Sequence, residues 1–176
     1  MVFERGLHDQ KVTAWAAFSF QGVIGPFFFM DDDEDTVTVT SERYIKILSN
    51  FWRRIGKLVP NRDKQWFQQD GAAPHVAKNS LNWLREHFGE RLISRSTDHS
   101  WSVCSPDLTL LGFHLWGYLK DIIPNEHYDN LQELRVTLCD RVREISNLQC
   151  ENVIQNALKR FQICIDHKGR HLEHVI

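Results

Sequence analysis

The segment that most constrains the fold is a run of aromatic and small apolar residues between positions 11 and 30. Apolar residues alternate along its first half, which predicts a strand with one buried face. Gln21-Gly22 is a turn signal, and residues 23–29 then predict a returning strand, so the segment is expected to form a β-hairpin. The residues expected on the buried face of the first strand are Val12, Ala14, Ala16, Phe18 and Phe20.

Helix and strand patterns alternate after an acidic loop at residues 31–35. A helix capped by Thr40 or Ser41 is expected to end at Gly56 and Pro60, because its apolar residues recur at helical spacing. A strand at 64–69, a helix at 76–88, a strand at 92–94, an aromatic helix at 110–119 and further helices to the end of the chain follow. This order predicts an α/β fold. The expected helical stripes are Tyr44, Leu48, Phe51 and Ile55; Ala77, Leu81, Leu84 and Phe88; Leu131, Leu134, Leu138, Val142 and Ile145; and Ile154, Ala157, Phe161 and Cys164.

Composition narrows the class of protein. The 176 residues are 42% apolar and include six Trp and eleven Phe, enough for one domain with an aromatic core. The four cysteines are scattered, which favours reduced thiols over a disulfide framework. Net charge is −2, whereas proteins that bind nucleic acid by its phosphates are usually basic. If the chain acts on nucleic acid, metal ions or another domain must supply part of the positive charge.

Two aspartates stand where catalytic carboxylates are often found. Asp70 follows the predicted strand at 64–69, and Asp107 precedes a predicted helix. Two such carboxylates could hold Mg²⁺ or Mn²⁺, which prefer oxygen ligands, and two such ions can support phosphodiester chemistry. Spacing alone leaves a second interpretation open, in which both are ordinary turn or cap residues.

The sequence around both aspartates resembles the Tc1/mariner transposases. The segment Trp66 to His75, which reads WFQQDGAAPH, resembles the surroundings of that family's second catalytic Asp. The segments 105–108 (SPDL) and 113–120 (FHLWGYLK) resemble the surroundings of the third. Further similar segments, in the family's order, are KVTAW at 11–15, TVTSERY at 38–44, RLISR at 91–95 and GRHLE at 169–173.

The resemblance implies an RNase H-like fold, a mixed sheet flanked by helices, that cuts and joins DNA with three carboxylates and two metal ions. Asp70 and Asp107 would be the second and third metal ligands, and we expect them within reach of one shared ion. His75 would be a helix-start residue near the site, or contact DNA or a metal ligand. Transposon-end DNA, a homodimer and a nuclear location are also implied, in one partial domain at 1–176 with a helical extension at 125–176.

Three departures from the family pattern predict a chain that is inactive by itself. No residue aligns with the first Asp, so the first central strand is expected to be missing, and Asp9 falls in the connection before the next strand. No helix-turn-helix half is present. The loop before and after Asp107 also lacks the family's proline-rich pattern. The alternative is a non-catalytic remnant of a transposable element that binds nucleic acid or another protein.

Two other patterns suggest metal sites on spacing alone. Cys164, His167, His171 and His174 have a spacing that zinc could use, but exposed histidines at a helix end give the same pattern. The acidic run 31–35 lacks the glycine and the spaced ligands of a calcium loop, so we interpret it as a solvated connection.

Overall fold

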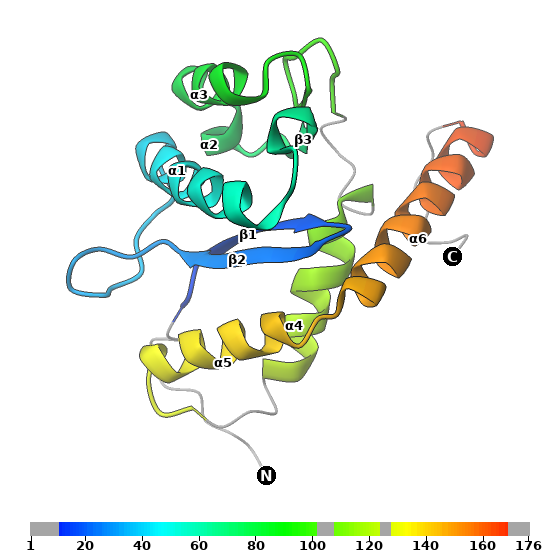
Figure 1. Ribbon diagram of the computed structural model, residues 1–176. Helices are drawn as coiled ribbons and strands as arrows, with labels where there is room; N and C mark the ends of the chain where they lie inside the picture. The colour runs from blue at the N-terminus through cyan, green and yellow to red at the C-terminus, as the bar shows by residue number, and fades with distance from the viewer. Residues whose placement is uncertain (1–10, 102–107, 124–127, 169–176) are drawn as a thin grey trace.

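The computed structural model describes residues 11–101, 108–123 and 128–168. Figure 1 shows a central β-hairpin with helices above and below it. The strands are β1 (Ala14–Ser19), β2 (Gly22–Phe28), β3 (Phe67–Gln68) and β4 (Leu92–Ile93). The helices are α1 (Ser41–Leu58), α2 (Ala73–Val76), α3 (Lys78–Phe88), α4 (Trp116–Ile122), α5 (Leu131–Arg143) and α6 (Asn147–Asp166).

The predicted hairpin is present, with its turn one residue earlier than expected. β1 and β2 are antiparallel, and Ser19 pairs with Gly22, so the two-residue loop is Phe20-Gln21. The prediction that Phe20 lies on the buried face is therefore wrong: its side chain sits in the turn and is 46% exposed. The register also shifts between Trp15 and Ala17, because β2 advances three residues, from Phe27 to Ile24, where β1 advances two.

Both faces of the hairpin are covered by other elements, whereas the sequence pattern predicted only one buried face. On one face, Trp15 and Ala17 pack against a cluster centred on α1, which we call the α1 core. On the other face, Ala16 and Phe18 pack against a second cluster, the α5 core. The α1 core is built mainly from α1, α3, β2, β3 and β4 (Figure 1). The α5 core contains Ala16, Leu115, Leu119, Val142, Ile145 and Cys150.

Helix α1 follows its predicted stripe. Thr40 is the N-cap, and its hydroxyl accepts a hydrogen bond from the Arg43 N–H. The four predicted apolar residues are buried, and Ile47 joins them. The prediction that Gly56 ends the helix is wrong, because α1 continues through it to Leu58. A Cβ on Gly56 would lie 2.6 Å from the Arg62 Nη1 atom, so this glycine leaves space for the Arg62 guanidinium.

The two short strands form a second sheet beside the hairpin. β3 and β4 are parallel, with Phe67 opposite Leu92. β3 is shorter than the strand predicted at 64–69. The residues before it, Arg62–Lys64, form a 3₁₀ turn. Among the described residues the hairpin and the β3–β4 pair are separate two-stranded sheets. The expected absence of a central strand stays a prediction. Side chains span the space between them: the Phe51 ring centroid lies 5.3 Å from that of Trp15 and 5.9 Å from that of Phe67.

The helix predicted at 76–88 is present as α3, which begins two residues later than predicted, at Lys78, because Ala77 has an extended backbone (φ −59°, ψ 144°). The short helix α2, which was not predicted, precedes it and ends at Val76. The predicted stripe holds in α3, where Leu81, Leu84 and Phe88 are buried.

The C-terminal third is helical, as predicted. A π-helical turn at Leu111–Leu115 leads into α4, and Ser146 forms a capping box with Gln149 at the start of α6. The buried side of α6 is set by Cys150, Val153 and Ala157. The predicted boundary at residue 125 lies outside the described residues and stays a prediction. None of the helices among the described residues is long and apolar enough to cross a membrane.

The acidic run is an exposed loop, which confirms the predicted solvated connection. The Asp31 Oδ1 atom accepts hydrogen bonds from the N–H groups of Asp33 and Asp35, at 3.2 and 2.9 Å. Glu34 takes a left-handed backbone conformation (φ 65°). Its carboxylate lies 3.4 Å from the guanidinium of the buried Arg135, which also donates to the Glu34 carbonyl. This contact joins α5 to the loop that follows the hairpin.

Candidate catalytic carboxylate and its support

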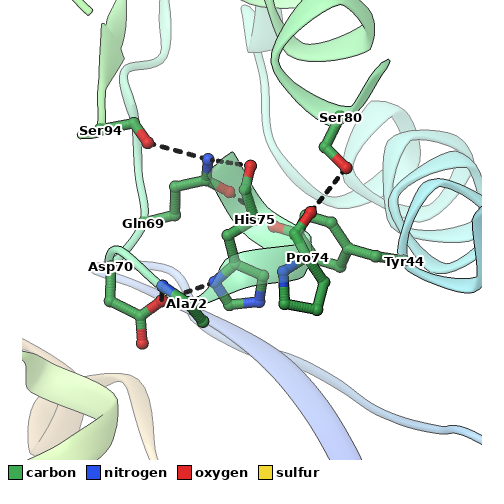
Figure 2. A network of polar contacts seen from close by, with 8 residues as sticks. All are labelled: Tyr44, Gln69, Asp70, Ala72, Pro74, His75, Ser80 and Ser94. Carbon is green, nitrogen blue, oxygen red and sulfur yellow. Dashed lines mark hydrogen bonds and ion pairs between the residues drawn. The ribbon is translucent and has the colours of Figure 1, made fainter. Parts of the chain in front are cut away.

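Asp70 lies directly after β3, where the chain leaves the small sheet. Its Oδ1 atom accepts a hydrogen bond from the Ala72 N–H at 3.1 Å and lies 2.6 Å from the Nδ1 atom of His75, the two contacts drawn in Figure 2. The hydrogen bond from His75, aided by the Ala72 N–H and the charge of His75, lowers the pKa of the Asp70 carboxyl group although partial burial opposes this. The side chain is 51% exposed, so an ionised carboxylate is both held in place and open to solvent.

His75 belongs to the short helix α2. Its side chain is 18% exposed, and its ring lies against that of Tyr44, with centroids 4.4 Å apart. One role predicted for His75 was a contact with a metal ligand. The structure places its ring against Asp70, the candidate metal ligand. The predicted DNA contact by His75 stays a prediction.

Gln69 anchors this corner through three side-chain hydrogen bonds (Figure 2). Its side-chain oxygen accepts a hydrogen bond from the Tyr44 hydroxyl at 2.8 Å. Its amide nitrogen donates to the Ser94 hydroxyl at 2.9 Å and to the His75 carbonyl at 3.0 Å. Because Gln69 is 7% exposed and makes all three bonds, it ties α1, β3, β4 and α2 together directly beside Asp70.

Tyr44 contributes to the same network from α1. Its side chain is fully buried, and burial together with the nearby charge of Asp70 raises the pKa of its phenol above the ordinary value. Tyr44 therefore stays a neutral hydrogen-bond donor to Gln69. A further bond, from the Ser80 hydroxyl to the Pro74 carbonyl at 2.7 Å, holds the start of α3 against α2.

Sequence reasoning did not find this supporting network. It placed Tyr44 only in an apolar stripe and left Gln69 and Ser94 without a role. One signal was available: Gln69 is two positions after the buried Phe67, so strand alternation points its side chain inward, where a polar group needs partners.

The other predicted site residues are not brought together among the described residues. Asp107 and Asp9 lie outside them, so the predicted approach of Asp70 and Asp107 stays a prediction. Within the described part of the chain, no three His, Cys, Asp or Glu side chains are grouped so that they could hold a metal ion. Of the zinc-like pattern, Cys164 is in α6 and His167 caps it, while His171 and His174 lie outside the described residues.

The fold described above is similar to that of a mariner transposase catalytic domain. The structure superimposes on the catalytic domain of the Mos1 mariner transposase with a TM-score of 0.80 and 19% identity, covering 93% of this chain and 77% of that one. A pre-cleavage Mos1 transpososome gives a TM-score of 0.82 at 17% identity, covering 98% of this chain and 48% of that one. The RNase H-like fold and the resemblance indicated by the motifs are therefore confirmed.

One curated relative is also similar in sequence. Human histone-lysine N-methyltransferase SETMAR is 25% identical over 170 residues, which is 95% of this chain and 23% of SETMAR. The chain thus spans about a quarter of that relative, and the activity in the relative's name is not transferred to it. No protein-family model matches the chain.

Proposed function

We propose that this chain is a transposase-derived domain of the lineage that cuts and joins DNA, with Asp70 and Asp107 as ligands for Mg²⁺ or Mn²⁺. The observation that carries the proposal is the anchoring of Asp70: one carboxylate oxygen is fixed by two donors at the end of β3, and the group stays ionised and half exposed. Solved structures of the similar Mos1 catalytic domain are described with Mg and with Mn.

The donor chemistry at Asp70 fits such an ion. A half-exposed ionised carboxylate is a hard oxygen ligand, which Mg²⁺ and Mn²⁺ prefer. When bound in pairs, these ions activate the attacking oxygen and stabilise the leaving oxygen of a phosphodiester. Asp70 would hold the ion, and His75 and the Ala72 N–H would orient the carboxylate. Asp107, which lies outside the described residues, is our candidate for a second ligand.

DNA is the proposed partner. Mos1 structures of the same fold include a strand transfer complex and a paired-end complex with a transposon end. For this chain we propose weak, salt-sensitive DNA binding, because its net charge is −2. The homodimer and the nuclear location belong to the same proposal.

Titration with Mn²⁺, with binding measured by electron paramagnetic resonance, tests the metal site. We expect weak binding, because two carboxylates make an incomplete site, and a loss of about tenfold in affinity for Asp70→Asn and for Asp107→Asn. Asp98→Asn removes an exposed carboxylate elsewhere and should leave the affinity unchanged. Equal affinity in the wild type and Asp70→Asn would contradict the proposal and favour the non-catalytic alternative, which needs no carboxylate at this position.

An oligonucleotide assay tests the expected inactivity. The 176 residues, with Mg²⁺ or Mn²⁺, should show no strand transfer and at most trace nicking that Asp70→Ala does not change. Loss of part of a mutually dependent catalytic set removes most of the rate. Robust cleavage that disappears in Asp70→Ala would mean that another residue completes the set of carboxylates.

A further inference from the structure

A basic hollow lies at the end of α1 remote from Asp70. Residues 53–64 contain five of the chain's 21 basic residues and one of its 23 acidic residues. The C-terminal turns of α1 and the turn that follows line an open hollow of about 690 Å³. Its charged lining residues are Arg53, Lys57, Arg62 and Asp63. The hollow therefore has a local positive excess in a chain of net negative charge.

Arg62 is held in a fixed position within this hollow. Its guanidinium carbon lies 4.4 Å from the centroid of the Trp52 ring, and Nη1 donates to the Trp52 carbonyl at 3.3 Å. Nε lies 3.6 Å from the Asp63 carboxylate, which is 83% exposed. The absence of a side chain on Gly56 makes room for the guanidinium. Together these contacts hold the Arg62 guanidinium in one position before any anion binds, so this cation is preorganised.

Arg53 and Lys57 present a second pair of cations. They are one helical turn apart on α1, so they lie on the same side of the helix, and both are exposed. Arg53 contacts the Asn50 side chain. The C-terminal end of a helix carries a partial negative charge, so the backbone here does not attract an anion. Any anion bound in the hollow must be held by these side chains.

The position of the hollow matches an extended polyanion. Tyr44, which supports the Asp70 corner, and Lys57 are separated by 13 residues of α1, or about 20 Å along the helix axis. That distance corresponds to roughly six base pairs of duplex DNA. Guanidinium groups bind phosphate oxygens with two parallel hydrogen bonds, and a lysine adds a point charge.

We propose that this hollow binds the phosphate backbone of duplex DNA, at a position separate from the phosphate presented to Asp70. The inference rests on the proposed function for the choice of DNA as the ligand. It adds a contact surface formed by Arg53, Lys57 and Arg62. Charge removal here should weaken binding to all DNA sequences alike, because phosphates carry no sequence information.

Fluorescence anisotropy with a labelled 30-base-pair duplex at low salt tests the surface. The double variant Arg53→Gln/Lys57→Gln should lose about five- to tenfold in affinity, and the slope of log K against log salt should fall by about two. The matched control, Lys120→Gln/Lys159→Gln, removes two exposed lysines from α4 and α6 and should lose less than twofold. Thermal unfolding of each variant checks that the fold is intact.

Gly56→Ala separates geometry from net charge. The added methyl group would displace the Arg62 guanidinium, the flexible end of a side chain, so the fold should survive while DNA affinity falls about threefold. Equal losses in the double variant and its control, or none in either, would overturn the proposal. So would tighter binding of poly-glutamate than of the duplex, which would assign the hollow to an acidic protein. The Mn²⁺ titration reports on Asp70 independently, so failure here is distinguishable from failure of the proposed function.

Discussion

At the scale of single residues, we expect His114 to make the stability of the fold depend on pH. It lies beside the rings of Phe18 and Tyr118, with centroid distances of 6.1 and 6.4 Å. Partial burial among these rings lowers the pKa of the His114 imidazole. The folded chain therefore binds this proton less readily than the unfolded chain, whose histidine titrates near 6.5.

We expect stability that is present above pH 6.5 to be lost as the pH falls through the lowered pKa of folded His114. Between pH 7.5 and 5.5, the free energy of unfolding of the wild type should fall more than that of His114→Phe, which carries no titrating group there. Urea unfolding of both proteins at the two pH values measures the difference. Parallel losses in the two proteins would show that His114 does not contribute.

At the scale of elements, the join between α1, β3, β4 and α2 depends on Gln69. Replacement by Leu would leave the Tyr44 hydroxyl, the Ser94 hydroxyl and the His75 carbonyl without this partner. Since an unsatisfied buried polar group costs about 1–3 kcal/mol, we expect Gln69→Leu to lower the free energy of unfolding by about 2–4 kcal/mol.

The neighbouring Gln68 provides the matched control, because it is the last residue of β3 and is exposed. Gln68→Leu should change the free energy of unfolding by less than about 0.5 kcal/mol. Urea unfolding of the two variants side by side makes the comparison. Similar losses in both would mean that the strand, and not the hydrogen-bond network, determines the cost.

The same elements show what the sequence could and could not predict. Local periodicity was sufficient for α1, since its stripe and its Thr40 cap are set within one helix. It failed at Gly56, because the reason for that glycine is Arg62, six residues beyond it in a different element. The second covered face of the hairpin depends on α4, α5 and α6, which periodicity within β1 cannot report.

The candidate site was likewise predicted only in part from the sequence. Asp70 was found through a local motif. The residues that support it were not, since Tyr44 and Ser94 each lie 25 positions from Gln69 and meet it only in the folded chain. The break at Ala77 was also missed, because α2 is held by contacts to Asp70 and Gln69 and not by its own apolar spacing.

At the scale of the whole molecule, β1 and β3 have edges that are not paired with each other among the described residues. Unpaired strand edges are templates for association, and buried unpaired backbone groups cost about 1–3 kcal/mol each, against about 5–15 kcal/mol for a whole domain. We expect the 176 residues to unfold in a broad transition at low urea and to associate as concentration rises.

Urea unfolding at two protein concentrations, with size-exclusion chromatography, tests this expectation. The comparison protein carries a designed β-strand fused before residue 1, which should sharpen the transition and raise its midpoint. A sharp transition for the 176 residues as a monomer, with no gain from the longer chain, would show that these edges are already covered.

The hairpin also determines how the molecule opens. Among the described residues, β1 and β2 are the elements that contribute to both the α1 core and the α5 core. Either helical layer can therefore open while the hairpin keeps the other layer against it. In hydrogen–deuterium exchange, the amides of β1 and β2 should exchange last, and the two helical layers should exchange as separate cooperative units.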